Sequence, residues 1–165
     1  MEVSFAEYIN DVIRIMIILY LSRENKSIRL TERKIELYDF FLRFPKAMTD
    51  TDLPLEKKEW NFDEYYAFFH WQPDIIRYRQ ALNYLIAKNF AEKTIEESSV
   101  IYSITDIGAD AFNSISNEYK NNLAELMAIQ LPKLNKLSDT KIEEMIRTRS
   151  KAFAQKGGIA DESQN

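Results

Sequence analysis

Apolar residues recur every three or four positions over two stretches near the start of the chain, as they do along one face of an α-helix. The first stretch predicts a helix over residues 5–23, with Ser4 as its N-cap and Glu7 completing a capping box. The second predicts a helix over residues 32–44, with Thr31 as its N-cap. The chain is therefore expected to begin with two helices.

The apolar run inside the first helix, residues 12–21, is too short to span a membrane. A membrane-spanning helix needs about 20 consecutive apolar residues, and Arg14 interrupts this run. Acidic residues precede it, whereas a signal peptide begins with basic ones; they are Glu2, Glu7 and Asp11. We therefore expect a helix that is buried around most of its circumference, in a cytoplasmic protein.

The middle of the chain predicts a third helix followed by a β-hairpin. The apolar positions of residues 74–88 fall mostly on one helical face. Two short strand-like runs follow, residues 90–95 and 100–104, and the polar sequence EESS between them predicts an acidic hairpin tip. Thr105 then caps a fourth helix, which is expected to continue until Pro132 stops it.

Three helices followed by a two-stranded hairpin are typical of a winged-helix domain. Gly108 supports this interpretation, because a glycine there lets the fourth helix pass close to the preceding strand. The predicted fold is mainly helical: a winged-helix domain over residues 1–132 with an insert at about 46–71, a C-terminal helical extension over 133–156, and a disordered tail over 157–165.

The composition narrows the chemistry that the chain can perform. It has no cysteine and a single histidine, His70, which excludes disulfide frameworks, thiolate ligands and nucleophiles, and most histidine-based metal sites. No glycine-rich phosphate-binding loop occurs, so the chain itself is not expected to be an ATPase. We therefore expect no enzymatic activity, no metal and no cofactor.

Basic residues near the second and third helices are candidates for contact with DNA, although the net charge of the chain is −4. In a DNA-binding winged helix the third helix enters the major groove and the wing contacts phosphate. The predicted wing is acidic, which disfavours phosphate, so we expect weak binding of duplex DNA without sequence preference. The candidate DNA contacts are Lys26, Arg29, Arg33, Lys34, Arg77, Arg79 and Lys88.

Apolar residues outside the winged-helix elements form the candidate protein-binding surface. An aromatic block lies in the insert, and an apolar stripe runs along one face of the last predicted helix, residues 139–154. Each either completes the core or binds a partner, since aromatic residues often anchor interfaces. We expect docking through these regions rather than through the hairpin. The candidate partner-binding residues are Trp60, Tyr65, Phe68, Trp71, Met145, Ile146 and Phe153.

The layout resembles the middle component of bacterial ABC-three-component systems, equivalent to the small subunit of Lamassu anti-phage defence complexes. The resemblance covers roughly residues 14–123. It departs at residues 50–71, where a long aromatic segment replaces the short glycine- and histidine-containing loop of the family, so no role of that loop is carried over. The matching segments are RIMIILYL, TERKIELYDFFLRFPKAM, RYRQALNYLIAKNFAEKT and YSITDIGADAF.

This resemblance implies a non-catalytic adaptor in antiviral defence. Such an adaptor links an ATPase similar to structural-maintenance-of-chromosomes (SMC) and double-strand-repair proteins to an effector subunit, often a nuclease, and contacts duplex DNA only weakly, through the complex. The residues leave one alternative open: a stand-alone winged-helix transcriptional regulator that dimerises through its long helices and binds duplex DNA.

Overall fold

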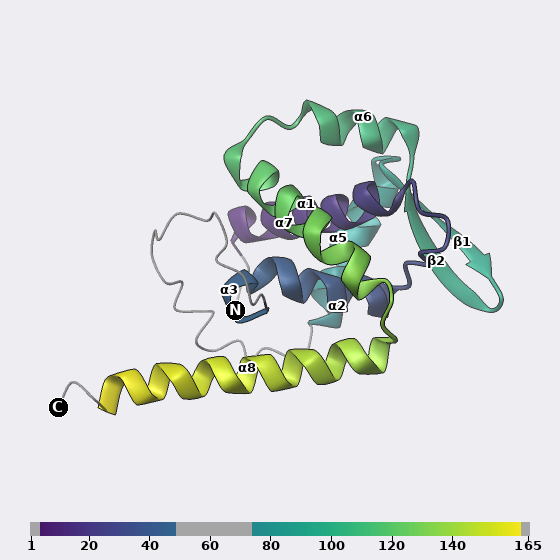
Figure 1. Ribbon diagram of the computed structural model, residues 1–165. Coiled ribbons are helices and arrows are strands. Elements are labelled where there is room, and N and C mark those ends of the chain that lie inside the picture. The colour runs from purple at the N-terminus through teal and green to yellow at the C-terminus, as the bar shows by residue number, and fades with distance from the viewer. Residues whose placement is uncertain (1–3, 49–73, 163–165) are drawn as a thin grey trace.

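The computed structural model describes residues 4–48 and 74–162; for residue 154 and residues 156–162 it describes the backbone alone. Seven helices and one two-stranded antiparallel sheet lie within these residues, so this part of the chain is mainly helical, as predicted (Figure 1). In chain order the elements are α1 (Phe5–Ser22), α2 (Glu32–Arg43), α3 (Pro45–Met48), α5 (Ile75–Ala87), β1 (Ala91–Glu96), β2 (Ser99–Ile104), α6 (Asp106–Ser114), α7 (Glu118–Leu134) and α8 (Asp139–Glu162).

Local hydrogen bonds explain where the first two helices begin. The Glu7 N–H donates to Ser4 Oγ (3.2 Å), and the Ser4 N–H donates to Glu7 Oε2 (3.0 Å), which is the predicted capping box. At the start of α2 the Lys34 N–H donates to Thr31 Oγ1 (3.1 Å). Both predicted helix starts are confirmed.

The core is built around α1. Every residue from 11 to 19 is buried, which confirms the prediction of a helix enclosed on most sides. Helices α2, α5 and α7 all pack against α1, and α7 crosses both α1 and α2 (Figure 1). No helix among the described residues is long and apolar enough to cross a membrane.

The predicted hairpin forms, with a tighter tip than the sequence indicated. The register pairs Ala91 with Ile104 at the base and Glu96 with Ser99 at the tip. Only Glu97 and Ser98 remain in the turn, both with positive φ (48° and 67°). Two such residues are typical of the type I′ turn, whose twist matches that of the flanking strands.

Gly108 allows a close approach between α6 and the hairpin, as predicted. A Cβ atom added at Gly108 would lie 1.9 Å from the carbonyl oxygen of Phe90 and 2.9 Å from Cγ1 of Ile104. Thr105 caps α6 by accepting from the Gly108 N–H (2.9 Å), and its hydroxyl donates to the Asn89 carbonyl (2.6 Å). These contacts fix α6 on the base of the hairpin.

The prediction of one continuous fourth helix ending before Pro132 was wrong. Helix α6 ends at Ser114 and α7 starts at Glu118, with Asn117 as a new N-cap. Lys120, which is buried, donates through Nζ to two carbonyls at the end of α6 (2.8 and 2.9 Å) and thereby stabilises the break. Pro132 lies inside α7, where burial of the neighbouring Leu131 and Leu134 offsets the lost backbone hydrogen bond.

Helix α8 is longer than expected. It continues to Glu162, past the predicted end near residue 154, so the segment 157–165, predicted to be disordered, begins as helix. Helix α8 packs against α2 and α3 and then extends past the other helices (Figure 1).

Candidate functional site: a buried ion-pair network and an acidic hairpin

A charged network lies where α1, α2 and α5 meet. Arg14 of α1 and Asp39 of α2 are 6% and 0% exposed. Arg14 Nε donates to Asp39 Oδ1 (2.7 Å), and Arg14 Nη2 donates to Asp39 Oδ2 (3.3 Å). This bidentate pair satisfies both carboxylate oxygens and joins the two helices. Burial is tolerated because each charge has a charged partner.

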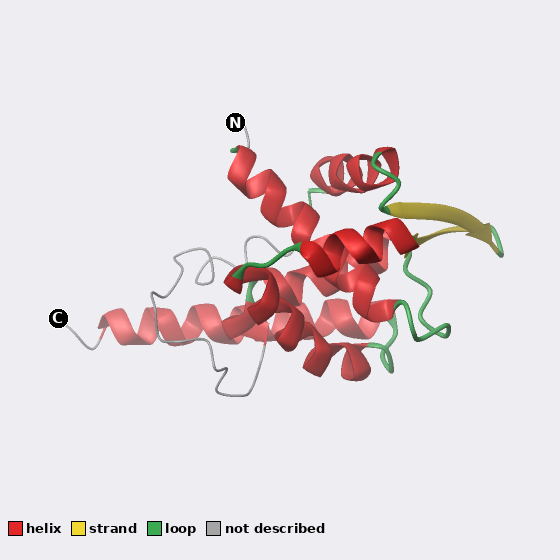
Figure 2. Cartoon of the chain, turned by 90° about the horizontal axis from the view of Figure 1, so that it is seen from above, coloured by secondary structure: helices red, strands yellow, loops and turns green. Residues whose placement is uncertain are grey.

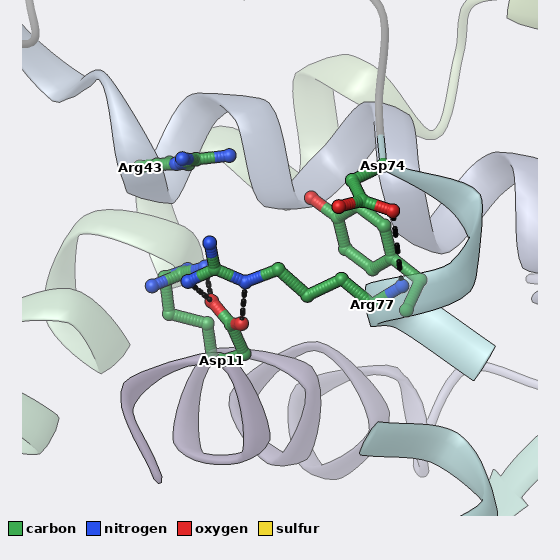
Figure 3. A pocket seen from close by; sticks show the side chains of 6 residues that line it. Asp11, Arg43, Asp74 and Arg77 are labelled. Carbon is green, nitrogen blue, oxygen red and sulfur yellow. Dashed lines mark hydrogen bonds and ion pairs between the residues drawn. The ribbon is translucent and has the colours of Figure 1, made fainter. Parts of the chain in front are cut away.

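Helix α5 completes the network with two side chains, Arg77 and Tyr78, and Figure 3 shows Arg77 reaching Asp11. Arg77 donates to both carboxylate oxygens of Asp11, and Arg14 Nη2 also donates to Asp11 Oδ1. The Tyr78 hydroxyl donates to Asp39 Oδ2. The network therefore alternates arginines and carboxylates across three helices.

Burial and partner charges shift the pKa values of Arg14 and Tyr78, among other groups of the network. Burial alone would lower the pKa of Arg14, but the charge of Asp39 and their hydrogen bond raise that pKa well above its usual value. Burial and the Asp39 carboxylate raise the pKa of Tyr78 well above its usual value, so its phenol stays a donor. These shifts keep the Arg14 guanidinium charged and the Tyr78 phenol protonated.

A small depression of about 10 Å³ lies beside the network. Arg43 of α2 and Asp74, the N-cap of α5, line its rim (Figure 3). Within the described residues no group of three or more histidine, aspartate or glutamate side chains is placed to hold a metal ion.

The hairpin tip forms a second charged site, this one exposed. Arg29 precedes α2 and donates through Nε to Glu96 (3.1 Å) and through Nη1 to Glu97 (2.9 Å). The hydrogen bond from Arg29 and its positive charge lower the pKa of Glu97. The acidic tip predicted from the sequence is therefore held by a cation from another part of the same chain.

Residues 5–156 match the model of one protein family, "ABC-three component (ABC-3C) system Middle Component 2". The chain belongs to this family. No curated protein and no solved structure matches the chain. A middle component of a multi-component system implies partner subunits. The surface of this middle component is therefore the part of the molecule that bears on its function.

Most of the candidate DNA contacts of this middle component already have acidic partners. Lys88 lies 5.9 Å from the ring centroid of Tyr84, and Lys26 is exposed. The other five candidates form ion pairs with which a DNA phosphate would have to compete. Contact of all seven residues with DNA stays a prediction. The pairs are Arg29 with Glu96 and Glu97, Arg33 with Glu36 and Glu143, Lys34 with Asp139, Arg77 with Asp11, and Arg79 with Glu32.

The candidate partner-binding residues of α8 lie against the domain. Ile146 is 2% exposed and belongs to the core, while Met145 and Phe153 are partly buried against it. In this conformation they complete the core of the chain, and their role in partner binding stays a prediction. The remaining candidates lie outside the described residues: Trp60, Tyr65, Phe68 and Trp71, along with the single histidine, His70.

Sequence reasoning missed the buried network, although its signal is present. Asp39 is spaced from Ile35 and Leu42 so that it falls on the buried face of α2, and Arg14 interrupts the apolar run of α1. Opposite charges on two buried helix faces need partners, and the partners available to them are each other. Tyr78 gave no such signal, since a tyrosine in an amphipathic helix is most often a packing residue.

Proposed function

We propose that the chain is a non-catalytic scaffolding subunit of a bacterial anti-phage defence complex of the Lamassu kind, built on an SMC-like ATPase. In this role it links the ATPase to an effector subunit such as a nuclease. The family match over residues 5–156 carries the proposal, because a middle component acts with other components.

We also propose that the domain is a winged helix. Its support is the order α1, α2, α5, β1 and β2, together with one further backbone contact. The Tyr102 N–H of β2 donates to the carbonyl of Leu30 (2.9 Å), so the segment before α2 lies beside the hairpin as a third extended piece of chain. This arrangement is shared by winged-helix domains of many functions, so it does not by itself select one.

The electrostatics favour a scaffold over a DNA-reading regulator. Arg77 and Arg79 lie on the helix that would enter the major groove, but both are engaged by carboxylates, those of Asp11 and Glu32. The hairpin that would contact phosphate ends in Glu96 and Glu97. Each such carboxylate opposes the phosphate neutralisation on which DNA affinity mainly rests.

Co-expression of the full chain with the other components of its system tests the scaffold proposal. We expect a stable complex on size-exclusion chromatography, and we expect omission of this chain to leave the ATPase and effector components unlinked. Loss of phage protection when the chain is deleted should accompany the loss of linkage. A complex of ATPase and effector that assembles and protects equally well without this chain would overturn the proposal.

DNA binding by the isolated chain separates the scaffold from the regulator. The scaffold proposal predicts weak association with any duplex, declining steeply as salt is raised. A tight complex with one duplex sequence that survives physiological salt would instead establish the regulator.

A further inference from the structure

The two edges of the hairpin differ in whether their backbone groups are used. At the β2 edge, the Tyr102 N–H donates to the carbonyl of Leu30 (2.9 Å), so the backbone N–H of Tyr102 points away from β1. Tyr102 is the register partner of Lys93. In an antiparallel ladder, two partners either bond to each other or both point outward. The N–H and C=O of Lys93 therefore point away from the sheet at the β1 edge.

The N–H and C=O of Ile95 point the same way as those of Lys93, because the direction of the backbone groups repeats every second residue of a strand. Among the described residues, none forms a hydrogen bond with the backbone N–H or C=O of Lys93 or Ile95. Every β1 residue after Ala91 is exposed, and the hairpin projects clear of the helices (Figure 2). The β1 edge thus offers unpaired donors and acceptors, which is a template for strand addition.

The side chains beside this edge have different chemistry on the two faces of the hairpin. Ile95 and Val100 are opposite each other in the register, lie on the same face as Lys93, and are 79% and 42% exposed. The other face of β1 carries Glu92, Thr94 and Glu96. A strand added at this edge would place alternate side chains beside an apolar pair and beside two carboxylates.

We propose that the β1 edge binds an extended segment of a partner component as an added strand. Residues of that segment alternate between apolar side chains beside Ile95 and lysine or arginine side chains facing Glu92; Glu96, on the same face, is already paired with Arg29. The inference rests on the proposed function, since it needs a partner component, and it adds the docking surface. It places docking on the hairpin, where the sequence pattern predicted none.

Charge argues against a second copy of this chain as the occupant. Two antiparallel β1 strands would pair through their outward residues, which limits the registers available. Two registers give the largest overlap between the strands. One of them places Lys93 opposite Lys93, and the other places Glu92 opposite Glu96. Like charges directly opposite each other destabilise a strand pair. A basic, apolar strand from a different protein avoids both conflicts.

Hydrogen exchange of single amides, compared between the isolated chain and the complex co-expressed with the other components of its system, tests the proposal. In the isolated chain we expect fast exchange of the Lys93 and Ile95 amides, with the Tyr102 amide protected by Leu30. In the complex we expect all three to be protected. A complex in which Lys93 and Ile95 still exchange fast overturns this inference and leaves the proposed function standing, whereas failure to form any complex overturns both.

A pair of variants separates the backbone of Lys93 from its side chain. Lys93→Pro removes the outward N–H without removing a hydrogen bond of the hairpin, and we expect at least a tenfold loss of the recovered complex. Lys93→Ala removes the same side chain but keeps the N–H, and we expect recovery within twofold of the wild type. Protection of the Tyr102 amide in each isolated variant reports that the hairpin is intact. Equal recovery of both variants, with intact hairpins, would contradict strand addition.

Discussion

Two sets of ion pairs in this chain use the same chemistry at different depths. Arg14 and Asp39 are buried between α1 and α2, whereas Arg29 reaches Glu96 at the hairpin tip with its side chain 45% exposed. The buried pair has lost its hydration, so each member depends on the other. Water screens the exposed pair and competes for its partners. Burial, rather than the number of contacts, thus decides which pair holds elements together.

The largest effect should come from leaving one buried charge without its partner. Asp39→Asn removes the carboxylate that Arg14 and Tyr78 share, and we expect it to destabilise the chain by about 3–5 kcal/mol. Urea denaturation measures the change. Asp106→Asn makes the same substitution at an exposed carboxylate paired with Arg23, and is expected to have little effect. Similar losses for both variants would show that burial is not what distinguishes the two sets.

A smaller loss of stability is expected from adding a methyl group where the backbone itself is packed closely. Gly108→Ala gains about 1 kcal/mol of helix propensity, but its Cβ would meet the carbonyl oxygen of Phe90, a backbone atom that moves only with the strand. The clash outweighs the propensity, so we expect a net loss of about 1–2 kcal/mol in thermal unfolding. Asp110→Ala, at an exposed position of the same helix, is the control. A Gly108→Ala variant more stable than the wild type would mean that α6 can move away from the hairpin at little cost.

A gain in stability is expected from removing a buried polar atom that has no hydrogen-bond partner within the described residues. The Tyr38 hydroxyl is buried and accepts or donates no hydrogen bond within the described residues. Tyr38→Phe should therefore stabilise the chain by about 1 kcal/mol at neutral pH.

The same variant should change the response of the chain to alkaline pH. Burial, and then the charge of Asp139, raise the pKa of Tyr38 from 10.0 to about 12. Because the folded-state pKa is the higher one, ionisation of this tyrosine favours the unfolded chain, so the folded chain loses stability as pH rises from 10 through 12. Tyr38→Phe should lose less stability across this interval. Parallel curves for the wild type and the variant would contradict the assignment.

The smallest effect is expected at the exposed pair. Arg29→Ala removes the cation that holds Glu96 and Glu97, and we expect the unfolding midpoint to stay near that of the wild type. Added salt should narrow whatever difference remains, because it screens exposed charges. A loss comparable with that of Asp39→Asn would mean that the hairpin tip is fixed as firmly as the helices.

The sequence was sufficient for the helix caps and for the hairpin turn. Ser4, Thr31 and Thr105 cap the helices that they were predicted to cap, and the hairpin lies where alternating residues flank a polar turn. It failed at the junction of α6 and α7, because a buried lysine reaching back to two carbonyls has no local pattern. The candidate site followed the same division: the acidic tip was predicted, and the ion-pair network in the chain's core was not.

The sequence by itself determined where the first helices and the hairpin begin and that the chain is mainly helical, because caps, turns and apolar periodicity act over a few residues. Only the tertiary structure decided which charges meet. Arg14 and Asp39 are 25 residues apart, and Arg29 lies 67 residues before Glu96. Their pairing depends on how α1, α2 and the hairpin pack. The open β1 edge has the same origin, since the segment at Leu30 covers β2 and leaves the other edge free.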